Sequence, residues 1–267
     1  RLRDALANSY NIPAVELLSE IGVESLLEIS NRLGIYSLEP DPTRYGLSLT
    51  LGGGEVAPLE MASAFGAFAN GGHLVEPQYV LRVEDSDGNM LYEKPAEQGP
   101  QVLDERIAYL ISSILEDNAA RTPAMGADSP LRLDFPAAVK TGTTNDYRDN
   151  WTIGYTPHLV VAVWAGNTDN TPMAEGTSGL TGAAPIWHSF MRTVLSGSPA
   201  RAFTRPEGLV QVEVCSLSGA LPGLCPYRRS EWFIAGTQPS QTDTYYREVV
   251  LDASSGVMAG ESTPPSQ

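Results

Sequence analysis

The chain has 267 residues, 42% of them hydrophobic, which is enough to bury the core of one large domain or of a domain with an appendage. Its formal net charge of −15 argues against nucleic acid as a partner and against a basic membrane-binding surface, because both require clustered Lys and Arg. No segment approaches the roughly 20 consecutive apolar residues of a membrane span.

The N-terminal part predicts a helical hairpin over the first 35 residues. Pro13 is tolerated in the first turn of a helix, which Gly22 ends, and a second apolar stripe stops at Gly34. Arg1 to Leu6 already has the character of a helix interior, so we expect the chain to be a piece of a longer protein. The apolar positions at helical spacing are Ala14, Leu17, Leu18 and Ile21, then Leu26, Ile29 and Leu33.

The next part of the chain predicts a helix and a β-hairpin. Pro58 opens the helix, and Asn70-Gly71-Gly72 closes it. Residues 79–93 alternate as two strands around Asp85-Ser86-Asp87-Gly88-Asn89. A calcium loop has its glycine at another position, so a turn between strands explains this loop better.

A strongly amphipathic helix capped by Asp104 precedes three strand-like runs. These runs are residues 135–141, 150–155 and 159–166, and the last is almost entirely apolar, as in a strand covered on both faces. A helix opened by Pro185 follows. The order of these elements predicts an α+β domain with a mainly antiparallel sheet.

Beyond residue 198 the composition changes, because Pro, Gly, Ser and Thr become frequent and strand-like pieces become short. We therefore expect residues 1–197 to form the main domain and residues 198–267 to form a small β-rich C-terminal module, with a weak tail from Ser254 onward. The strand-like pieces of this module are residues 209–214, 231–234 and 247–251.

The module contains both cysteines of the chain, Cys215 and Cys225. They can close a small loop by a disulfide in an oxidising compartment, or they can be two unpaired thiols, and the sequence does not choose between these. The histidines His73, His158 and His188 are scattered and form no metal-binding or triad pattern. No metal and no cofactor is therefore expected.

Ser9-Tyr10-Asn11 is one candidate for chemistry. Ser9 and Asn11 lie two residues apart just before a helix, where they can direct a hydroxyl and an amide into one space. The competing interpretation is structural, since Asn is a good N-cap, and for Asn11 taken alone the cap is favoured.

Lys140-Thr141-Gly142-Thr143-Thr144 is the other candidate. A positive charge, hydroxyls and a glycine at the end of a buried strand suit the binding of a carboxylate and an acyl oxygen. Gly142 allows a ligand to approach the backbone, and N–H groups of an edge strand can donate to a developing oxyanion. The competing interpretation is a surface lysine at the end of a strand.

Together these two motifs resemble the transpeptidase domain of penicillin-binding proteins, in which Lys-Thr-Gly is one of three site elements. The segments 51–62, 68–72 and 149–157 strengthen the likeness, which is closest to class A, bifunctional members and covers residues 1 to about 195. The segments around the two cysteines and residues 233–239 look like the appendage of some class A members, including the 1C type.

The resemblance implies the penicillin-binding-protein and serine β-lactamase-like fold and a D,D-transpeptidase activity without cofactors. A serine attacks the penultimate D-Ala carbonyl of a peptidoglycan stem peptide, D-Ala leaves, and an amine of a neighbouring stem attacks the acyl-enzyme. β-Lactam antibiotics mimic D-Ala-D-Ala and stop the reaction at the acyl stage. Peptidoglycan stem peptides and β-lactams are therefore the expected partners.

By the same resemblance, Ser9 is expected to relay a proton between the lysine of the nucleophile motif and the leaving amine. Asn11 is expected to hold the acyl side chain and that lysine, and Lys140 to supply positive potential. The Thr143 N–H completes the oxyanion hole. The residues expected to bind substrate are Thr141, Gly142, Thr143 and Thr144. Among these, Thr141 and Thr143 are expected to bind the substrate carboxylate.

The sequence departs from the family in one respect, because no serine is followed three residues later by lysine. The family's Ser-x-x-Lys nucleophile and first helices are therefore expected outside this chain, which alone is expected to be inactive. The parent is expected at the outer face of the cytoplasmic membrane, with an upstream anchor and a glycosyltransferase domain. A β-lactam sensor domain and a non-catalytic scaffold are the alternatives.

Overall fold

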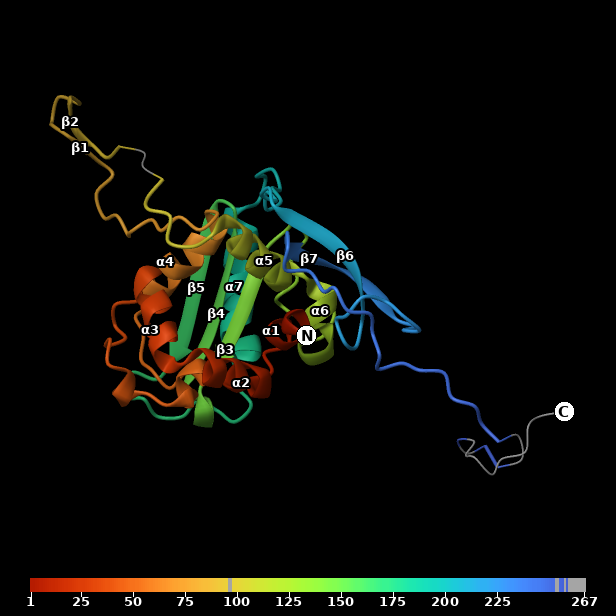
Figure 1. Ribbon diagram of the computed structural model, residues 1–267. Coiled ribbons are helices and arrows are strands. Elements are labelled where there is room, and N and C mark those ends of the chain that lie inside the picture. Colours follow the sequence, from red (N-terminus) through yellow and green to blue (C-terminus); the bar gives the residue numbers. More distant parts are fainter. Residues whose placement is uncertain (96–97, 253–254, 257, 259–267) are drawn as a thin grey trace. The chain divides into compact units, whose positions relative to one another are not determined.

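The computed structural model describes residues 1–95, 98–252, 255–256 and 258 (Figure 1). The chain divides into two compact units, Leu2–Glu207 and Arg1 with Gly208–Gln267. The expected domain boundary between residues 197 and 198 stays a prediction. No helix in the described part of the chain is long and apolar enough to cross a membrane.

The first unit is built on a three-stranded sheet. Its strands are β3 (Ala138–Thr143), β4 (Asp149–Thr156) and β5 (Leu159–Gly166), and both pairings are antiparallel. The predicted α+β class with a mainly antiparallel sheet is confirmed. Strand β3 begins at Ala138 rather than at the expected Phe135, because Pro136 has no N–H to give to a sheet.

One face of this sheet is covered by helix α7 (Ala184–Val194) and by η4 (Gly179–Ala183), a turn of π-helix that runs directly into it. Trp187 of α7 is completely buried and packs with Val139 of β3. A Cβ on Gly154 of β4 would lie 2.4 Å from the Trp187 ring, so the glycine allows the ring to lie against the strand.

The other face is covered by α4 (Pro58–Ala69) and α5 (Glu105–Glu116), as Figure 1 shows. Tyr155 of β4 is completely buried there and meets Phe65 edge to face. Its hydroxyl hydrogen-bonds to the Ser112 hydroxyl at 3.0 Å. Burial of this phenol raises its pKa far above the usual range.

The predicted N-terminal helices are confirmed as α1 (Leu2–Ala7), α2 (Asn11–Ile21) and α3 (Val23–Arg32). The Asp104 cap of α5 is confirmed too, since its carboxylate accepts the Arg106 N–H at 2.8 Å. Sequence reasoning missed α6 (Asn118–Met125), a short helix with Pro123 inside it. The described part of this unit also has three short 3-10 segments: η1 (Pro42–Arg44), η2 (Leu47–Leu51) and η3 (Asn145–Tyr147).

The predicted hairpin is present as β1 (Arg82–Glu84) and β2 (Met90–Glu93). Asp85 organises the connection, because its Oδ1 accepts the N–H groups of Asp87 and Asn89 at 2.9 and 2.8 Å. The aspartate-rich loop is therefore folded by its own side chain as a turn, which is the interpretation the sequence favoured.

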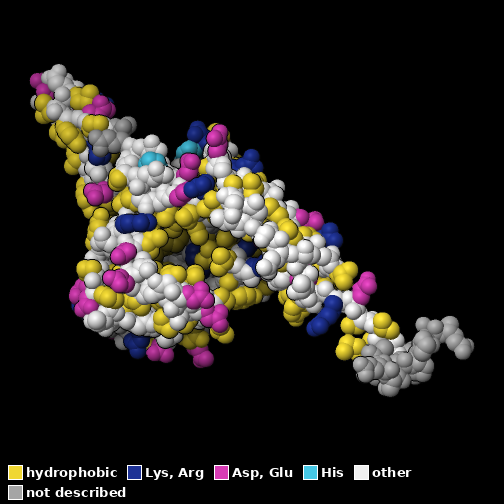
Figure 2. Space-filling model, viewed as in Figure 1, with side chains coloured by type: hydrophobic (Ala, Val, Ile, Leu, Met, Phe, Trp, Pro, Cys, Tyr) yellow, Lys and Arg dark blue, Asp and Glu magenta, His cyan; other side chains and the backbone are white. Residues whose placement is uncertain are grey.

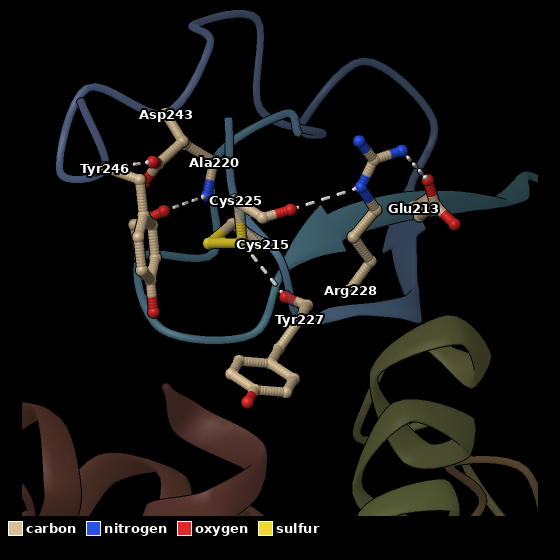
Figure 3. Close-up of a disulfide and its surroundings, with 9 residues drawn as sticks. Glu213, Cys215, Ala220, Cys225, Tyr227, Arg228, Asp243 and Tyr246 are labelled. Atoms are coloured by element: carbon tan, nitrogen blue, oxygen red, sulfur yellow. Dashed lines mark hydrogen bonds and ion pairs between the residues drawn. A yellow bond between two sulfur atoms is a disulfide. The ribbon is translucent and has the colours of Figure 1, made fainter. Parts of the chain in front are cut away.

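The second unit contains the antiparallel pair β6 (Leu209–Cys215) and β7 (Arg228–Ile234). Cys215 and Cys225 form a disulfide at the end of this pair (Figure 3). Arg228 stands beside it, donating to the Cys225 carbonyl at 3.4 Å and pairing with Glu213 at 3.3 Å.

The strand expected at residues 247–251 is wrong. The structure has only an isolated bridge there, between Leu251 and Met258. Val249 and Val250 are exposed, and the latter keeps 76% of its accessible surface. A β-branched run gives strand structure only where it pairs and packs against a neighbouring strand, and among the described residues this run has only the one bridge.

Candidate active site

Lys140 on β3 brings the two candidate motifs together. Its Nζ donates a hydrogen bond to Ser9 Oγ at 2.7 Å and another to the Thr141 carbonyl at 2.6 Å. Burial disfavours the charged form and lowers the pKa of this lysine to about 8. Within the described residues no carboxylate is ion-paired with the ammonium group, so its positive charge is available to an anionic ligand.

Ser9 is held by the turn that ends α1. The Tyr10 N–H donates to the Ala5 carbonyl at 2.9 Å and the Ser9 N–H to the Leu6 carbonyl at 3.2 Å, the pattern of a Schellman motif. Ser9 takes the left-handed position of that motif, with φ of 58°, where glycine is the usual residue. A serine in this strained position is typical of a functional site.

The preceding residue, Asn8, fixes this turn to the rest of the unit. Its side chain is buried and donates to the carbonyls of Asp4 and Ala120 at 2.9 and 2.7 Å. Its Oδ1 accepts the Ala124 N–H at 3.0 Å. Sequence reasoning missed Asn8, because two of its three partners belong to α6, which the sequence did not predict.

Asn11 is exposed and is the first residue of α2. The interpretation of Asn11 as an N-cap is wrong, since Tyr10 holds that position and α2 has no side-chain cap. The turn at Ser9 brings the chain into the helix one residue earlier than expected. The Asn11 amide makes no hydrogen bond within the described residues, so it is free to contact a ligand.

The side chains of β3 alternate between the faces of the sheet. Lys140 reaches the α1–α2 turn, whereas Thr141 and Thr143 lie on the face covered by η4. In the described part of the chain β3 pairs only with β4, so the other edge of β3 has no strand partner. A ligand lying along that edge can meet the ammonium group on one side and threonine hydroxyls on the other.

Asp149 holds the end of this strand. Its backbone N–H donates to Thr144 Oγ1 at 2.9 Å, and its carboxylate accepts the Thr144 hydroxyl at 3.0 Å and the Trp164 indole N–H at 2.9 Å. The Thr144 hydroxyl is thus engaged within the protein, and its expected contact with substrate stays a prediction. Asp149 was also missed as a site-supporting residue.

Figure 2 shows that this side of the molecule is hollowed over the sheet, with hydrophobic side chains around the hollow. The hollow lies between α4 and the α1–α2 region of Figure 1. No group of three or more His, Cys, Asp or Glu in the described ranges could hold a metal ion. The groups that this site can present to a ligand are an ammonium group, hydroxyls and backbone amides.

Known proteins of similar sequence and fold show to which family this site belongs. Residues 1–192 match the model of the family described as penicillin binding protein transpeptidase domain. The chain belongs to this family. Residues 205–248 match the family described as penicillin-binding protein 1A, C-terminal domain, and the chain corresponds to the transpeptidase region of class A penicillin-binding proteins. The 1C type expected for the tail stays a prediction.

Curated relatives agree with this assignment. The chain is 35% identical to penicillin-binding protein 1A of Neisseria lactamica over 213 residues, which are 78% of this chain and 26% of that protein. It is 35% identical to penicillin-binding protein 2D of Bacillus subtilis over 246 residues, 90% of this chain and 34% of that protein. The chain therefore spans between a quarter and about a third of the length of these relatives.

Solved structures of penicillin-binding proteins share the fold. Penicillin-binding protein 1A from Haemophilus influenzae superposes with a TM-score of 0.77 at 29% identity, covering 91% of this chain and 41% of that one. PonA1 from Mycobacterium tuberculosis in complex with penicillin V gives a TM-score of 0.66 at 25% identity, covering 77% of this chain and 59% of that one.

Proposed function

We propose that this chain supplies one wall of a D,D-transpeptidase site that cross-links peptidoglycan stem peptides by serine acyl transfer. The hydrogen bond of 2.7 Å from Lys140 Nζ to Ser9 Oγ carries the proposal. It joins residues 131 positions apart at an open strand edge, where an ammonium group orients a hydroxyl that can pass a proton. General acid–base catalysis requires such a positioned hydroxyl.

The roles follow from the chemistry of each group. Ser9 passes a proton towards the leaving amine, and the charge of Lys140 keeps its hydroxyl oriented and attracts the substrate carboxylate. Asn11, whose amide is free, binds the acyl side chain of the donor peptide. Thr141 and Thr143 donate to the carboxylate, Gly142 leaves room for the peptide, and the Thr143 N–H donates to the oxyanion.

The nucleophile of this reaction lies outside residues 1–267. The lysines of the sequence are Lys94 and Lys140, and the residues three positions before them are Leu91 and Ala137. Neither lysine can therefore complete a Ser-x-x-Lys motif. Residues 1–267 alone should form no covalent adduct with a β-lactam, whereas the protein that contains them should.

We place the parent protein in the cell envelope, at the outer face of the cytoplasmic membrane, anchored by a segment outside this chain. A disulfide between Cys215 and Cys225 suits such an oxidising location. Peptidoglycan stem peptides are the substrates, and β-lactams are inhibitors; penicillin V is the ligand in the PonA1 complex. We assign residues 1–197 to the transpeptidase domain and residues 198–267 to a small module.

The test is the rate of acylation of the full-length protein by a fluorescent penicillin. Ser9→Ala should lower the second-order rate constant by about 100-fold or more, the usual contribution of a positioned proton-transfer group. Ser19→Ala, the same change on the exposed side of α2, is the control and should leave the rate constant unchanged. Acylation of Ser9→Ala at the wild-type rate would contradict the proposal.

A further inference from the structure

The Thr143 hydroxyl has a second partner besides the expected ligand. Its oxygen accepts a hydrogen bond from the Gly179 backbone N–H at 2.9 Å. A hydroxyl has one proton to donate, and within the described residues the Thr143 hydroxyl gives that proton to no acceptor. The contact with Gly179 therefore occupies one acceptor direction of the oxygen and leaves the proton for an external acceptor.

Gly179 is itself fixed against the strands. It is buried, and its carbonyl accepts the Thr152 hydroxyl at 2.9 Å. A Cβ at this position would lie 2.5 Å from the carbonyl oxygens of Gly142 and Trp151. Only glycine allows the backbone to come this close, so the direction of its N–H is set by contacts with β3 and β4.

A capping box holds the start of η4. The Thr181 hydroxyl accepts the Ser178 N–H at 2.8 Å, and Ser178 Oγ accepts the Thr181 N–H at 3.3 Å. The Thr181 hydroxyl also donates to the Gly176 carbonyl at 3.1 Å. Thr181 is exposed, and these hydrogen bonds all join it to residues that precede Gly179 in the chain. A π-helical turn beside a strand edge is frequently associated with function.

We propose that η4 is a positioning element for the substrate carboxylate, in which the Gly179 N–H orients the Thr143 hydroxyl towards that carboxylate and Thr181 maintains the arrangement. This inference rests on the proposed transpeptidase function and extends it to residues that neither motif contains. Thr181 acts through Gly179 and Thr143, so it is a positioning residue. Specificity for a free carboxylate then depends on a segment 36 residues beyond the threonine that binds it.

The test compares benzylpenicillin with its methyl ester on the full-length protein, as the ratio of their acylation rate constants. Thr143→Val should lower the preference for the free acid by about 10-fold or more, since it removes a hydrogen bond to a charged group. Thr181→Val should lower it several-fold, and the double variant should be no worse than Thr143→Val, because the two act on one contact. Thr193→Val, which removes an exposed hydroxyl on α7, is the matched control and should keep the wild-type ratio.

The possible outcomes separate this inference from the proposed function. If the wild-type protein is not acylated, the proposed function fails. If Thr181→Val slows the acid and the ester equally, or leaves the ratio unchanged while Thr143→Val lowers it, η4 has only a structural role and the inference is overturned. Additive losses in the double variant would also overturn it, because they would show that Thr181 acts independently of Thr143.

Discussion

The left-handed backbone of Ser9 leads to a prediction in which stability and function move in opposite directions. Replacement of Ser9 by glycine removes the Cβ that makes φ of 58° unfavourable, and it also removes the hydroxyl bound by Lys140. Replacement by alanine removes the same hydroxyl but keeps the Cβ. The difference between Ser9→Gly and Ser9→Ala therefore isolates the conformational strain at this position.

The magnitude follows from two opposing effects. A left-handed conformation costs an L-residue about 1–2 kcal/mol. Glycine loses about 0.5–1 kcal/mol more conformational free energy than alanine on folding. Ser9→Gly should therefore be more stable than Ser9→Ala by about 0.5–1 kcal/mol. At Ser19, inside α2, the stability difference between the two variants has the opposite sign. There the glycine variant should be less stable than the alanine variant by about 0.8–1 kcal/mol.

Urea unfolding of residues 1–267, followed by tryptophan fluorescence, measures both pairs of variants. We expect opposite signs at the two serines, a contrast of about 1.3–2 kcal/mol. In the full-length protein, Ser9→Gly should react with β-lactams as slowly as Ser9→Ala despite its greater stability, as expected where a site keeps strain for function. If glycine is the less stable choice at both serines, Ser9 is not in the left-handed conformation and the reasoning is refuted.

Three further predictions concern stability. Asn8→Ala leaves buried partners on α1 and α6 without a hydrogen bond, so it should lower the free energy of unfolding in urea by about 2–4 kcal/mol. The control Asn31→Ala, at an exposed position, should lower it by less than about 0.5 kcal/mol. Equal losses in the two variants would contradict the anchoring role of Asn8. The pKa of Lys140 is about 8 in the folded protein against 10.5 for a free lysine, so the cost of burying its charge is fully present below pH 8 and is relieved as the pH rises towards 10.5. The stability of Lys140→Met relative to the wild type should therefore fall by about 3 kcal/mol between pH 7 and pH 10.5, and a difference independent of pH would argue against this shift. Reduction of the Cys215–Cys225 disulfide should destabilise the second unit by about 2–3 kcal/mol, and reductant should have no such effect on the Cys215→Ser, Cys225→Ser double variant.

The sequence predicted the elements whose signals are local. Helical periodicity, the Asp104 cap and the turn residues after Asp85 each act over a few positions, and the structure has all of them. The expected strand at residues 247–251 failed, because strand formation depends on a partner surface that a local pattern does not reveal.

In the candidate site, too, the sequence revealed local signals but not the contacts between distant residues. Both motifs were identified from their residues, but their meeting through Lys140 and Ser9 is a tertiary contact that only the fold shows. Asn8 was missed because two of its three partners lie on α6, and Pro123 inside that helix obscured its helical pattern in the sequence. Gly179 was missed because its importance comes from backbone atoms of β3 and β4 that lie close in space and distant in sequence.

The position of the penicilloyl group on the full-length protein identifies the nucleophile directly. The full-length protein is incubated with benzylpenicillin and digested, and the modified peptide is identified by mass spectrometry. We predict one adduct, on a serine of a Ser-x-x-Lys motif outside residues 1–267, and at least a 100-fold slower appearance of that adduct in Ser9→Ala. An adduct on any serine within residues 1–267 would contradict the claim that this chain forms the wall opposite the nucleophile.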